Sequence, residues 1–152
     1  MQNLELLREV AKTGFPIILK RHFGSSLRDF LGAAEHILIE GNNRLILCER
    51  GIRTFETHTR NTLDLNAIPA IKELSHLPII SDPSHGTGIR SYVAPMSKAS
   101  IAAGADGLIL EVHHDPDNSM TGDGVQSLFP DQFSTLMNDL KHLATAIGRN
   151  MD

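Results

Sequence analysis

The chain has 152 residues, 41% of them hydrophobic and 21% charged, which is typical of one globular domain with a sizeable core. A formal net charge of −4, without a basic patch interleaved with aromatics, argues against a nucleic-acid partner. The sequence has no apolar run of the roughly 18 to 20 residues that span a bilayer, no signal-peptide pattern and one cysteine, so we expect a cytoplasmic protein without membrane contact or internal disulfide.

Amphipathic segments with helical spacing alternate with short apolar runs of strand length. In chain order the pattern predicts a helix at 3–12, a strand at 15–19, a helix at 26–40, a strand at 45–48, a helix at 64–74, a strand at 77–81, a loop at 82–88, a helix at 92–103, a strand at 107–112 and a helix at 130–147. Ser25 or Ser26 is expected to cap the second helix and Asp64 the third. Pro130 suits a first helical position, and Pro95 is tolerable only in a first turn.

The four strands begin near residues 16, 45, 78 and 107, so a strand–loop–helix unit repeats about every 30 residues. Strands that are apolar on both faces and alternate with helices predict an α/β protein with a parallel sheet. A complete (β/α)8 TIM barrel needs about 200 to 250 residues and eight strands, so residues 1–152 have the size of half a barrel in a single partial domain. Its open strand edges predict self-association or a partner.

Three side chains that suit a metal ion follow the last two predicted strands. His85 lies just beyond the strand at 77–81, Glu111 closes the strand at 107–112, and Asp123 lies between two glycines in the next loop. One imidazole and two carboxylates suit a divalent Mn, Fe, Zn or Co ion. The alternative for His85 is a loop histidine that is hydrogen-bonded to Ser or Asp, and the alternative for Asp123 is an ordinary turn residue. The carboxylate of Glu111 ends an apolar strand, where it is costly to desolvate without a cation or a hydrogen-bond donor.

Cations also follow the strands. Lys20 and Arg50 end neighbouring strands, where Arg can grip phosphate or carboxylate with a planar fork and Lys acts as a point charge. The alternative for both is a solvated surface cation, and Arg53 has the same alternative in its loop. The segment 86–88, Gly-Thr-Gly, offers backbone N–H groups to an anion. Cys48 lies inside an apolar strand and is expected to be inert packing.

Several motifs at the strand ends resemble one known family. They are Leu19-Lys20-Arg21, the segment 47–56 (LCERGIRTFE), the segment 60–64 (RNTLD), the segment 82–88 (DPSHGTG), Glu111-Val112-His113 and the segment 123–128 (DGVQSL). In this order, and over essentially the whole chain, they resemble the 3-deoxy-7-phosphoheptulonate synthases (DAHP synthases) of the type I-beta group, which catalyse the first step of the shikimate pathway.

The resemblance implies the C-terminal half of a (β/α)8 barrel and a transferase that joins phosphoenolpyruvate to erythrose 4-phosphate with release of phosphate, for aromatic amino-acid biosynthesis. It implies that Lys20 and Arg50 are the catalytic residues that hold phosphoenolpyruvate, and that Arg53 also contacts substrate. It implies further that His85, Glu111 and Asp123 bind a divalent metal.

The chain lacks three motifs of the family pattern. The Gly-Pro-Cys motif that gives a fourth metal ligand is absent, and Cys48 stands in a different motif. The Lys-Pro-Arg-Thr-Ser and Gly-Ala-Arg-Asn segments, which grip substrate in the family, are absent too. The chain therefore matches the final four strands, and we expect no condensation activity from it in isolation.

Two other functions are compatible with the sequence. One is a non-catalytic fragment or subunit that complements a separate N-terminal half-barrel. The other is a related synthase that joins phosphoenolpyruvate to a longer sugar phosphate, although the segments 53–56 and 60–62 argue against it.

Overall fold

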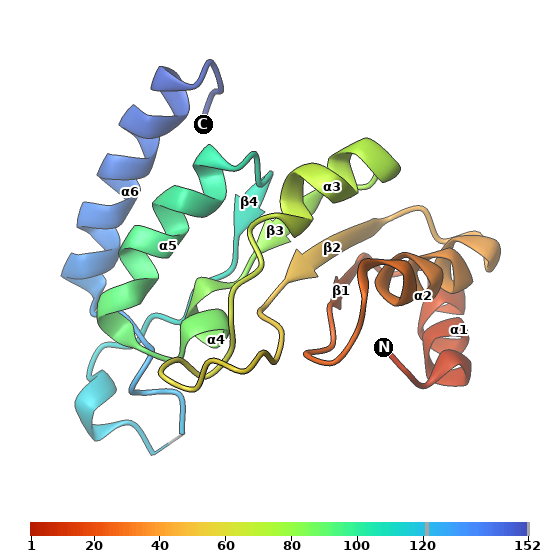
Figure 1. The fold of residues 1–152 in the computed structure, drawn as a ribbon, viewed down its shortest axis with the longest axis horizontal. Coiled ribbons are helices and arrows are strands. Elements are labelled where there is room, and N and C mark those ends of the chain that lie inside the picture. Colours follow the sequence, from red (N-terminus) through yellow and green to blue (C-terminus); the bar gives the residue numbers. More distant parts are fainter. Residues whose placement is uncertain (121, 152) are drawn as a thin grey trace.

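A parallel four-stranded sheet forms the centre of the computed structural model, which describes residues 1–120 and 122–151 (Figure 1). The strands lie in sequence order: β1 (Ile17–Lys20), β2 (Leu45–Glu49), β3 (Ile79–Ser81) and β4 (Gly107–Leu108). Every pairing is parallel, with Lys20 opposite Cys48 and Cys48 opposite Ile80. The predicted α/β class and the parallel sheet are confirmed.

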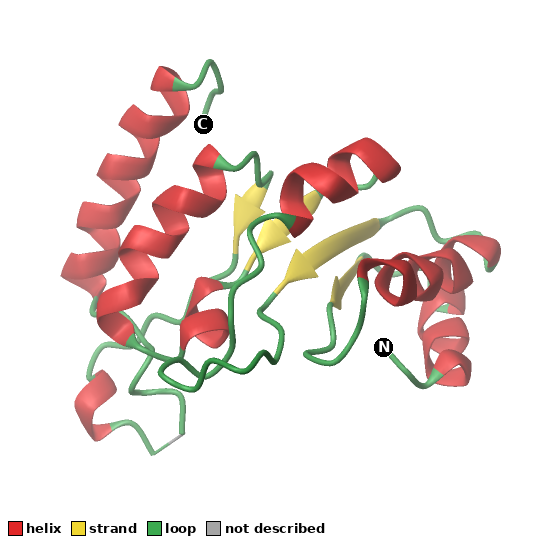
Figure 2. Cartoon of the chain, viewed as in Figure 1, coloured by secondary structure: helices red, strands yellow, loops and turns green. Residues whose placement is uncertain are grey.

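Helices follow or precede each strand. They are α1 (Leu4–Lys12), α2 (Leu27–Ile39), α3 (Ala67–Leu74), α4 (Pro83–Thr87), α5 (Arg90–Ala102) and α6 (Pro130–Ala146), with a 3-10 turn, η1 (Pro116–Asn118). Figures 1 and 2 show α1 and α2 near one end of the sheet and α5 and α6 near the other. The segments that follow the strands gather along one edge, at the bottom of these views. Among the described residues, none of the helices combines the length and apolarity that crossing a bilayer requires.

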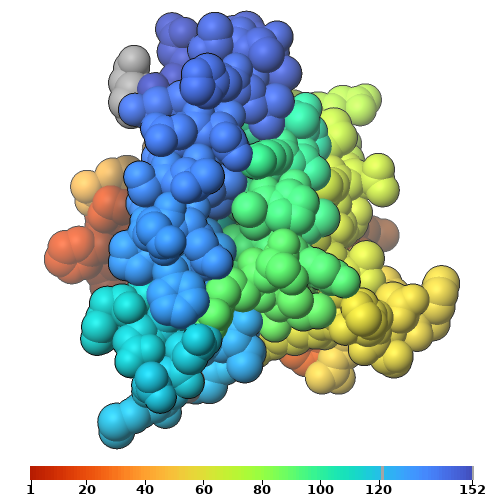
Figure 3. All heavy atoms as spheres, turned by 90° about the vertical axis from the view of Figure 1, so that its left-hand side faces the viewer, coloured from red at the N-terminus to blue at the C-terminus, as the bar shows by residue number. Residues whose placement is uncertain are grey.

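The core lies between the sheet and its helices because strand side chains alternate between two faces. Leu19, Leu47 and Ile79 belong to the main buried cluster with helix residues such as Phe30. The alternate positions in β1 to β3 point to the other face, where Ile18 is 46% exposed and the corresponding isoleucines of β2 and β3 are partly exposed. A second cluster joins the β4 region to α5 and α6, which lie side by side in Figure 3.

The predicted cap of α3 is wrong, while the cap of α2 is confirmed. Ser26 caps α2 in a reciprocal capping box with Asp29. Helix α3 begins only at Ala67, after Asn66, whose side chain makes no capping bond. Asp64 instead accepts a hydrogen bond from Arg21 Nη1 at 2.9 Å, because a buried guanidinium is a stronger donor for a carboxylate than a helix N–H.

The region after β3 also differs from the prediction. The expected loop at 82–88 is the short helix α4, capped by the Asp82 side chain and opened by Pro83. Helix α5 begins at Arg90, so Pro95 lies beyond its first turn. Strand β4 is shorter than the predicted 107–112, because its partner β3 ends at Ser81, which lies opposite Leu108.

Candidate functional site

Four polar side chains form a continuous row, the polar row, along the carboxyl edge of the sheet. Lys20 Nζ lies 2.8 Å from Asp82 Oδ2, and the same oxygen lies 2.9 Å from His85 Nδ1. On the other side of the imidazole, His85 Nε2 lies 3.7 Å from Glu111 Oε1. The row connects β1 with the segments after β3 and β4, as expected where the carboxyl ends of parallel strands meet.

Backbone hydrogen bonds position the two side chains of this row that could bind a metal, His85 and Glu111. His85 occupies the first turn of α4, where its backbone N–H donates to Asp82 Oδ1 at 3.0 Å. Glu111 is held nearby because its backbone N–H donates to Ser84 Oγ at 3.0 Å. The predicted proximity of His85 and Glu111 is therefore present in the structure.

Asp123, the third expected ligand, lies apart from this row. Its Oδ1 accepts a hydrogen bond from Gln126 Nε2 at 3.0 Å, and Gln126 Oε1 accepts one from Arg60 Nη1 at 3.3 Å. Figure 3 shows the cyan segment after β4, at the bottom of the view, projecting from the body of the molecule. Within residues 1–120 and 122–151, no three His, Cys, Asp or Glu side chains are placed to hold a metal ion together. Asp123 has no hydrogen bond or ion pair to the row among the described residues, and a three-ligand centre with Asp123 stays a prediction.

The imidazole of His85 has the surroundings of a metal ligand. Histidines that bind metals almost always donate their other ring N–H to a carboxylate or carbonyl, and Asp82 is such an acceptor here. Donors about 2.1 Å from one ion lie at most about 4.2 Å apart, so the 3.7 Å between His85 Nε2 and Glu111 Oε1 is compatible with a shared ion. This pair of donors fits a divalent cation.

The expected substrate cations have different surroundings. Arg50 follows β2, is half-buried and has no ion pair among the described residues, so its fork is free to bind an anion. Arg53 is exposed, and its guanidinium stacks over the ring of Phe23 at 4.2 Å from the centroid. The structure thus places Lys20 and Arg50 at the ends of adjacent strands, with Arg53 further out in the loop.

A buried ion-pair network lies at this edge, and no sequence pattern predicted it. Arg21 Nη1 lies 2.9 Å from Glu49 Oε2 and 2.9 Å from Asp64 Oδ2, and Glu49 is fully buried. Burial raises the pKa of the Glu49 carboxyl above its ordinary value, despite the hydrogen bonds from Arg21 and from the Gly51 N–H. For Arg21 burial acts to lower the pKa, but the two carboxylates outweigh it and raise the pKa.

The loop between β2 and α3 packs closely on α4. The N–H groups of Arg60 and Asn61 donate to the carbonyls of Thr87 and Gly86 at 3.0 and 3.1 Å. Gly51, with φ of +93°, makes this approach possible, since a Cβ there would lie 2.7 Å from Asn61 Cβ. The N–H groups of Gly86 and Gly88 donate within α4, so the expected anion cradle at 86–88 is wrong.

Cys48 is fully buried, as predicted, and burial raises the pKa of its thiol to about 12. Thiol reagents react with the thiolate, which is scarce when the pKa lies far above the ambient pH. We expect Ellman's reagent at about pH 8 to leave the folded chain unmodified and to titrate one thiol after denaturation. Rapid reaction of the folded chain would contradict this placement.

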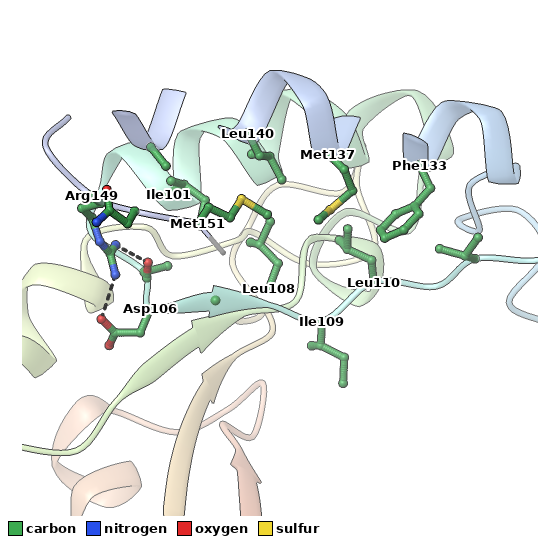
Figure 4. A pocket seen from close by; sticks show the side chains of 15 residues that line it. Ile101, Asp106, Leu108, Ile109, Leu110, Phe133, Met137, Leu140, Arg149 and Met151 are labelled. Carbon is green, nitrogen blue, oxygen red and sulfur yellow. Dashed lines mark hydrogen bonds and ion pairs between the residues drawn. The ribbon is translucent and has the colours of Figure 1, made fainter. Parts of the chain in front are cut away.

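An apolar groove of ≈ 480 Å³ lies away from the polar row (Figure 4). Leu108 and Leu110, from β4 and the residues after it, line one side, and Phe133, Met137 and Leu140 of α6 line the other. At one end Arg149 Nη2 lies 3.1 Å from Asp106 Oδ1. None of the side chains in the polar row lines this groove, whose walls are mainly apolar.

An aspartate partner for His85 was among the alternatives predicted from the sequence, but the role of Asp82 as a helix cap was missed. An aspartate directly before a proline, at the end of an apolar strand, is a helix N-cap signature. That signature would have predicted α4 and the side-chain acceptor next to His85. The Arg21–Glu49–Asp64 network joins positions 28 and 43 residues from Arg21, and no local pattern marks such pairs.

Comparisons with known proteins point to one family. The model of the "DAHP synthetase I family" matches residues 1–149. A curated protein of Thermotoga maritima, "Phospho-2-dehydro-3-deoxyheptonate aldolase", is 50% identical over 147 residues, covering 97% of this chain and 43% of that protein. A "2-dehydro-3-deoxyphosphooctonate aldolase" of Syntrophobacter fumaroxidans is 35% identical over 150 residues, covering 91% of this chain and 51% of that protein.

Solved structures are similar over nearly the whole chain. A truncated form of 3-deoxy-D-arabino-heptulosonate 7-phosphate synthase from Thermotoga maritima superposes with a TM-score of 0.97 at 48% identity, covering 99% of this chain and 57% of that one. A second DAHP synthase structure from this organism superposes with the same TM-score, and the match covers 44% of that longer chain. The chain thus spans about half the length of the relatives it matches.

Proposed function

The chain belongs to the DAHP synthetase I family, and from that premise we propose that it forms the C-terminal half of the site of a DAHP synthase. The reaction is the condensation of phosphoenolpyruvate with erythrose 4-phosphate, which releases inorganic phosphate. The observation that supports it best is the row Lys20–Asp82–His85–Glu111, which places a cation for an anionic substrate beside two donors for a divalent metal.

The side chains of the row have separate roles in this proposal. Lys20 and Arg50 hold the phosphate and carboxylate of phosphoenolpyruvate, Lys20 as a point charge and Arg50 as a fork. His85 and Glu111, with Asp123 as a further candidate, would hold a divalent ion. When bound, such an ion polarises the aldehyde carbonyl as a Lewis acid or positions a water.

The chemistry needs positioning more than a strong nucleophile. The C3 carbon of phosphoenolpyruvate attacks the aldehyde carbon, water adds at C2, and phosphate leaves as its bond to C2 breaks. Fixed cations beside the phosphoenolpyruvate bring C3 within reach of the aldehyde and stabilise the charge that moves to the departing phosphate. Lys20 and Arg50 supply that charge from adjacent strand ends.

The identities to relatives support a proposal for the length of the sugar phosphate. The relative named for the heptonate product is 50% identical, whereas those named for the octonate product are 29% to 35% identical. We therefore propose erythrose 4-phosphate as the sugar substrate, and a longer sugar phosphate is the alternative that a substrate comparison tests.

The site is proposed to work only together with further strands. Both outer edges of the sheet, at β1 and β4, lack a strand partner among the described residues. Ile18 is 46% exposed on the sheet face opposite the helices, and the apolar groove opens beside β4. We propose that an N-terminal half-barrel, or a second copy of this chain, covers these surfaces.

Light scattering after size exclusion tests this pairing. The isolated 16.7 kDa chain is expected to elute as a dimer or larger species, since parallel edges and an apolar sheet face are left open. A well-folded monomer at micromolar concentration would count against both modes of pairing.

A chimera tests the proposed reaction. In this variant the chain replaces the 147-residue segment it matches in the Thermotoga maritima protein, so the remaining half of the site comes from that relative. Phosphate release is expected only when phosphoenolpyruvate, erythrose 4-phosphate and a divalent metal such as Mn are all present. Arabinose 5-phosphate in place of erythrose 4-phosphate tests the longer sugar.

The control for the chimera separates folding from chemistry. His85→Ala is expected to lower phosphate release at least about 100-fold, because a proposed metal ligand is lost. His114→Ala, at an exposed position on the same edge, is expected to leave the rate within about twofold. Equal rates in the two variants would contradict the role of His85.

A further inference from the structure

We propose that Asp82 is a positioning residue that holds Lys20 and His85 at once, and so fixes which ring nitrogen of His85 is free. This proposal rests on the proposed function only for what Lys20 and His85 bind.

The Asp82 side chain is 1% exposed, and each of its oxygens has defined partners. Oδ2 accepts from Lys20 Nζ at 2.8 Å and lies 2.9 Å from His85 Nδ1. Oδ1 accepts from the His85 backbone N–H at 3.0 Å and lies 3.1 Å from Nδ1. One carboxylate therefore caps α4, contacts the imidazole and binds a cation from β1.

A carboxylate without a proton only accepts hydrogen bonds, so the ring atom that faces it must carry the hydrogen. Asp82 thus selects the neutral tautomer of His85 with hydrogen on Nδ1 and the lone pair on Nε2. That lone pair lies on the side of Glu111, whose Oε1 is 3.7 Å away. The tautomer leaves the Nε2 lone pair free to bind a cation beside the Glu111 carboxylate.

Lys20 is positioned by the same group. Its side chain is 39% exposed, and a lone ammonium on a flexible stem would sample many rotamers. The contact with buried Asp82 restricts the ammonium to a position 2.8 Å from Asp82 Oδ2. Asp82 therefore sets the distance between the ammonium of Lys20 on β1 and the imidazole of His85 on α4.

Asp82→Ser is the discriminating substitution. Serine is about as good a helix N-cap as aspartate, so α4 is retained, but its hydroxyl is too short to replace both carboxylate contacts. Lys20→Met is the matched control, because it removes the other partner of Asp82 and leaves the contact with His85 intact.

Long-range ¹H–¹⁵N NMR spectra of the isolated chain at about pH 9, where imidazoles are neutral, report the tautomer directly. We expect hydrogen on Nδ1 of His85 in the wild type and in Lys20→Met, and a shift towards hydrogen on Nε2 in Asp82→Ser. An Nε2–H tautomer in the wild type, or an unchanged tautomer in Asp82→Ser, overturns the proposal. The wild-type spectrum decides alone if the variant does not fold.

The chimera supplies a readout linked to function. Asp82→Ser is expected to raise the metal concentration needed for half-maximal rate about 10- to 100-fold, and this loss should exceed any change in the maximal rate. An unchanged metal requirement overturns the role of Asp82 at the metal site. Inactivity of the wild-type chimera counts against the proposed function and leaves the tautomer result standing.

Discussion

Replacement of Arg21 by methionine is expected to lower the free energy of unfolding by about 3–5 kcal/mol, because it leaves Glu49 buried without its cation. Two carboxylates, those of Glu49 and Asp64, converge on Arg21, and the variant leaves them facing each other. For a domain of this size the loss corresponds to a fall in melting temperature of about 6–20 °C in a thermal scan.

The pH dependence of this loss has a defined sign. Burial already raises the pKa of Glu49, and removal of Arg21 raises it further. An acid whose pKa is higher in the folded state binds its proton more readily there, so the deficit shrinks as the pH falls from about 8 to about 5. A deficit that grows in this range would contradict the assignment.

Arg28→Met is the matched control for this experiment. It makes the same chemical change at an exposed position on α2, where the free energy of unfolding is expected to change by no more than about 0.5 kcal/mol. Equal destabilisation by the two substitutions would show that loss of the long side chain, and not loss of the buried charge, is responsible.

The isolated chain is expected to release no phosphate from phosphoenolpyruvate and erythrose 4-phosphate, whatever divalent metal is added. It carries Lys20, Arg50, His85 and Glu111, but the relatives it matches are about twice its length. Catalysis by positioning needs both substrates to be held, and we expect the residues for this to be shared with the part of the barrel outside this chain.

The positive control for this experiment is the chimera, measured in the same phosphate-release assay. Its rate is expected in the range typical of enzymes, roughly 1 to 10³ per second, against no rate above the blank for the isolated chain. Turnover by the isolated chain at a comparable rate would overturn the requirement for further strands.

The fold was largely predictable because its strands are apolar on both faces and its helices on one. Runs such as Ile17-Ile18-Leu19 and Leu45-Ile46-Leu47 are short and bounded by polar residues, so both their type and their order follow from the pattern. The length of β4 was not predictable, since strand length depends on whether a neighbour supplies hydrogen bonds.

Capping residues were only partly predictable, because short polar side chains have competing partners. Ser26 caps its helix as expected, whereas Asp64 binds a distant arginine in preference to α3. Asp82 looked like a loop residue, although it caps α4. Local sequence shows which side chains are able to cap and leaves open which of them meets a stronger partner in the folded chain.

The candidate site followed from placement at strand ends, and its internal geometry did not. Placement alone brought Lys20, His85 and Glu111 to one edge, and the structure joins them in one row. It could not show that Asp82 links two of them, or that Asp123 is bound by Gln126. Such contacts depend on rotamers and loop paths, which have no periodic signature in the sequence.

The strand order 1-2-3-4 has a consequence for how the molecule is made. Every strand pairs only with the strand before it and the strand after it in the chain, so each hydrogen-bonded ladder closes over a short stretch of sequence. During synthesis each new strand and helix can dock on the unit that has just left the ribosome. Growth of this kind leaves the most recent edge open to receive the next strand.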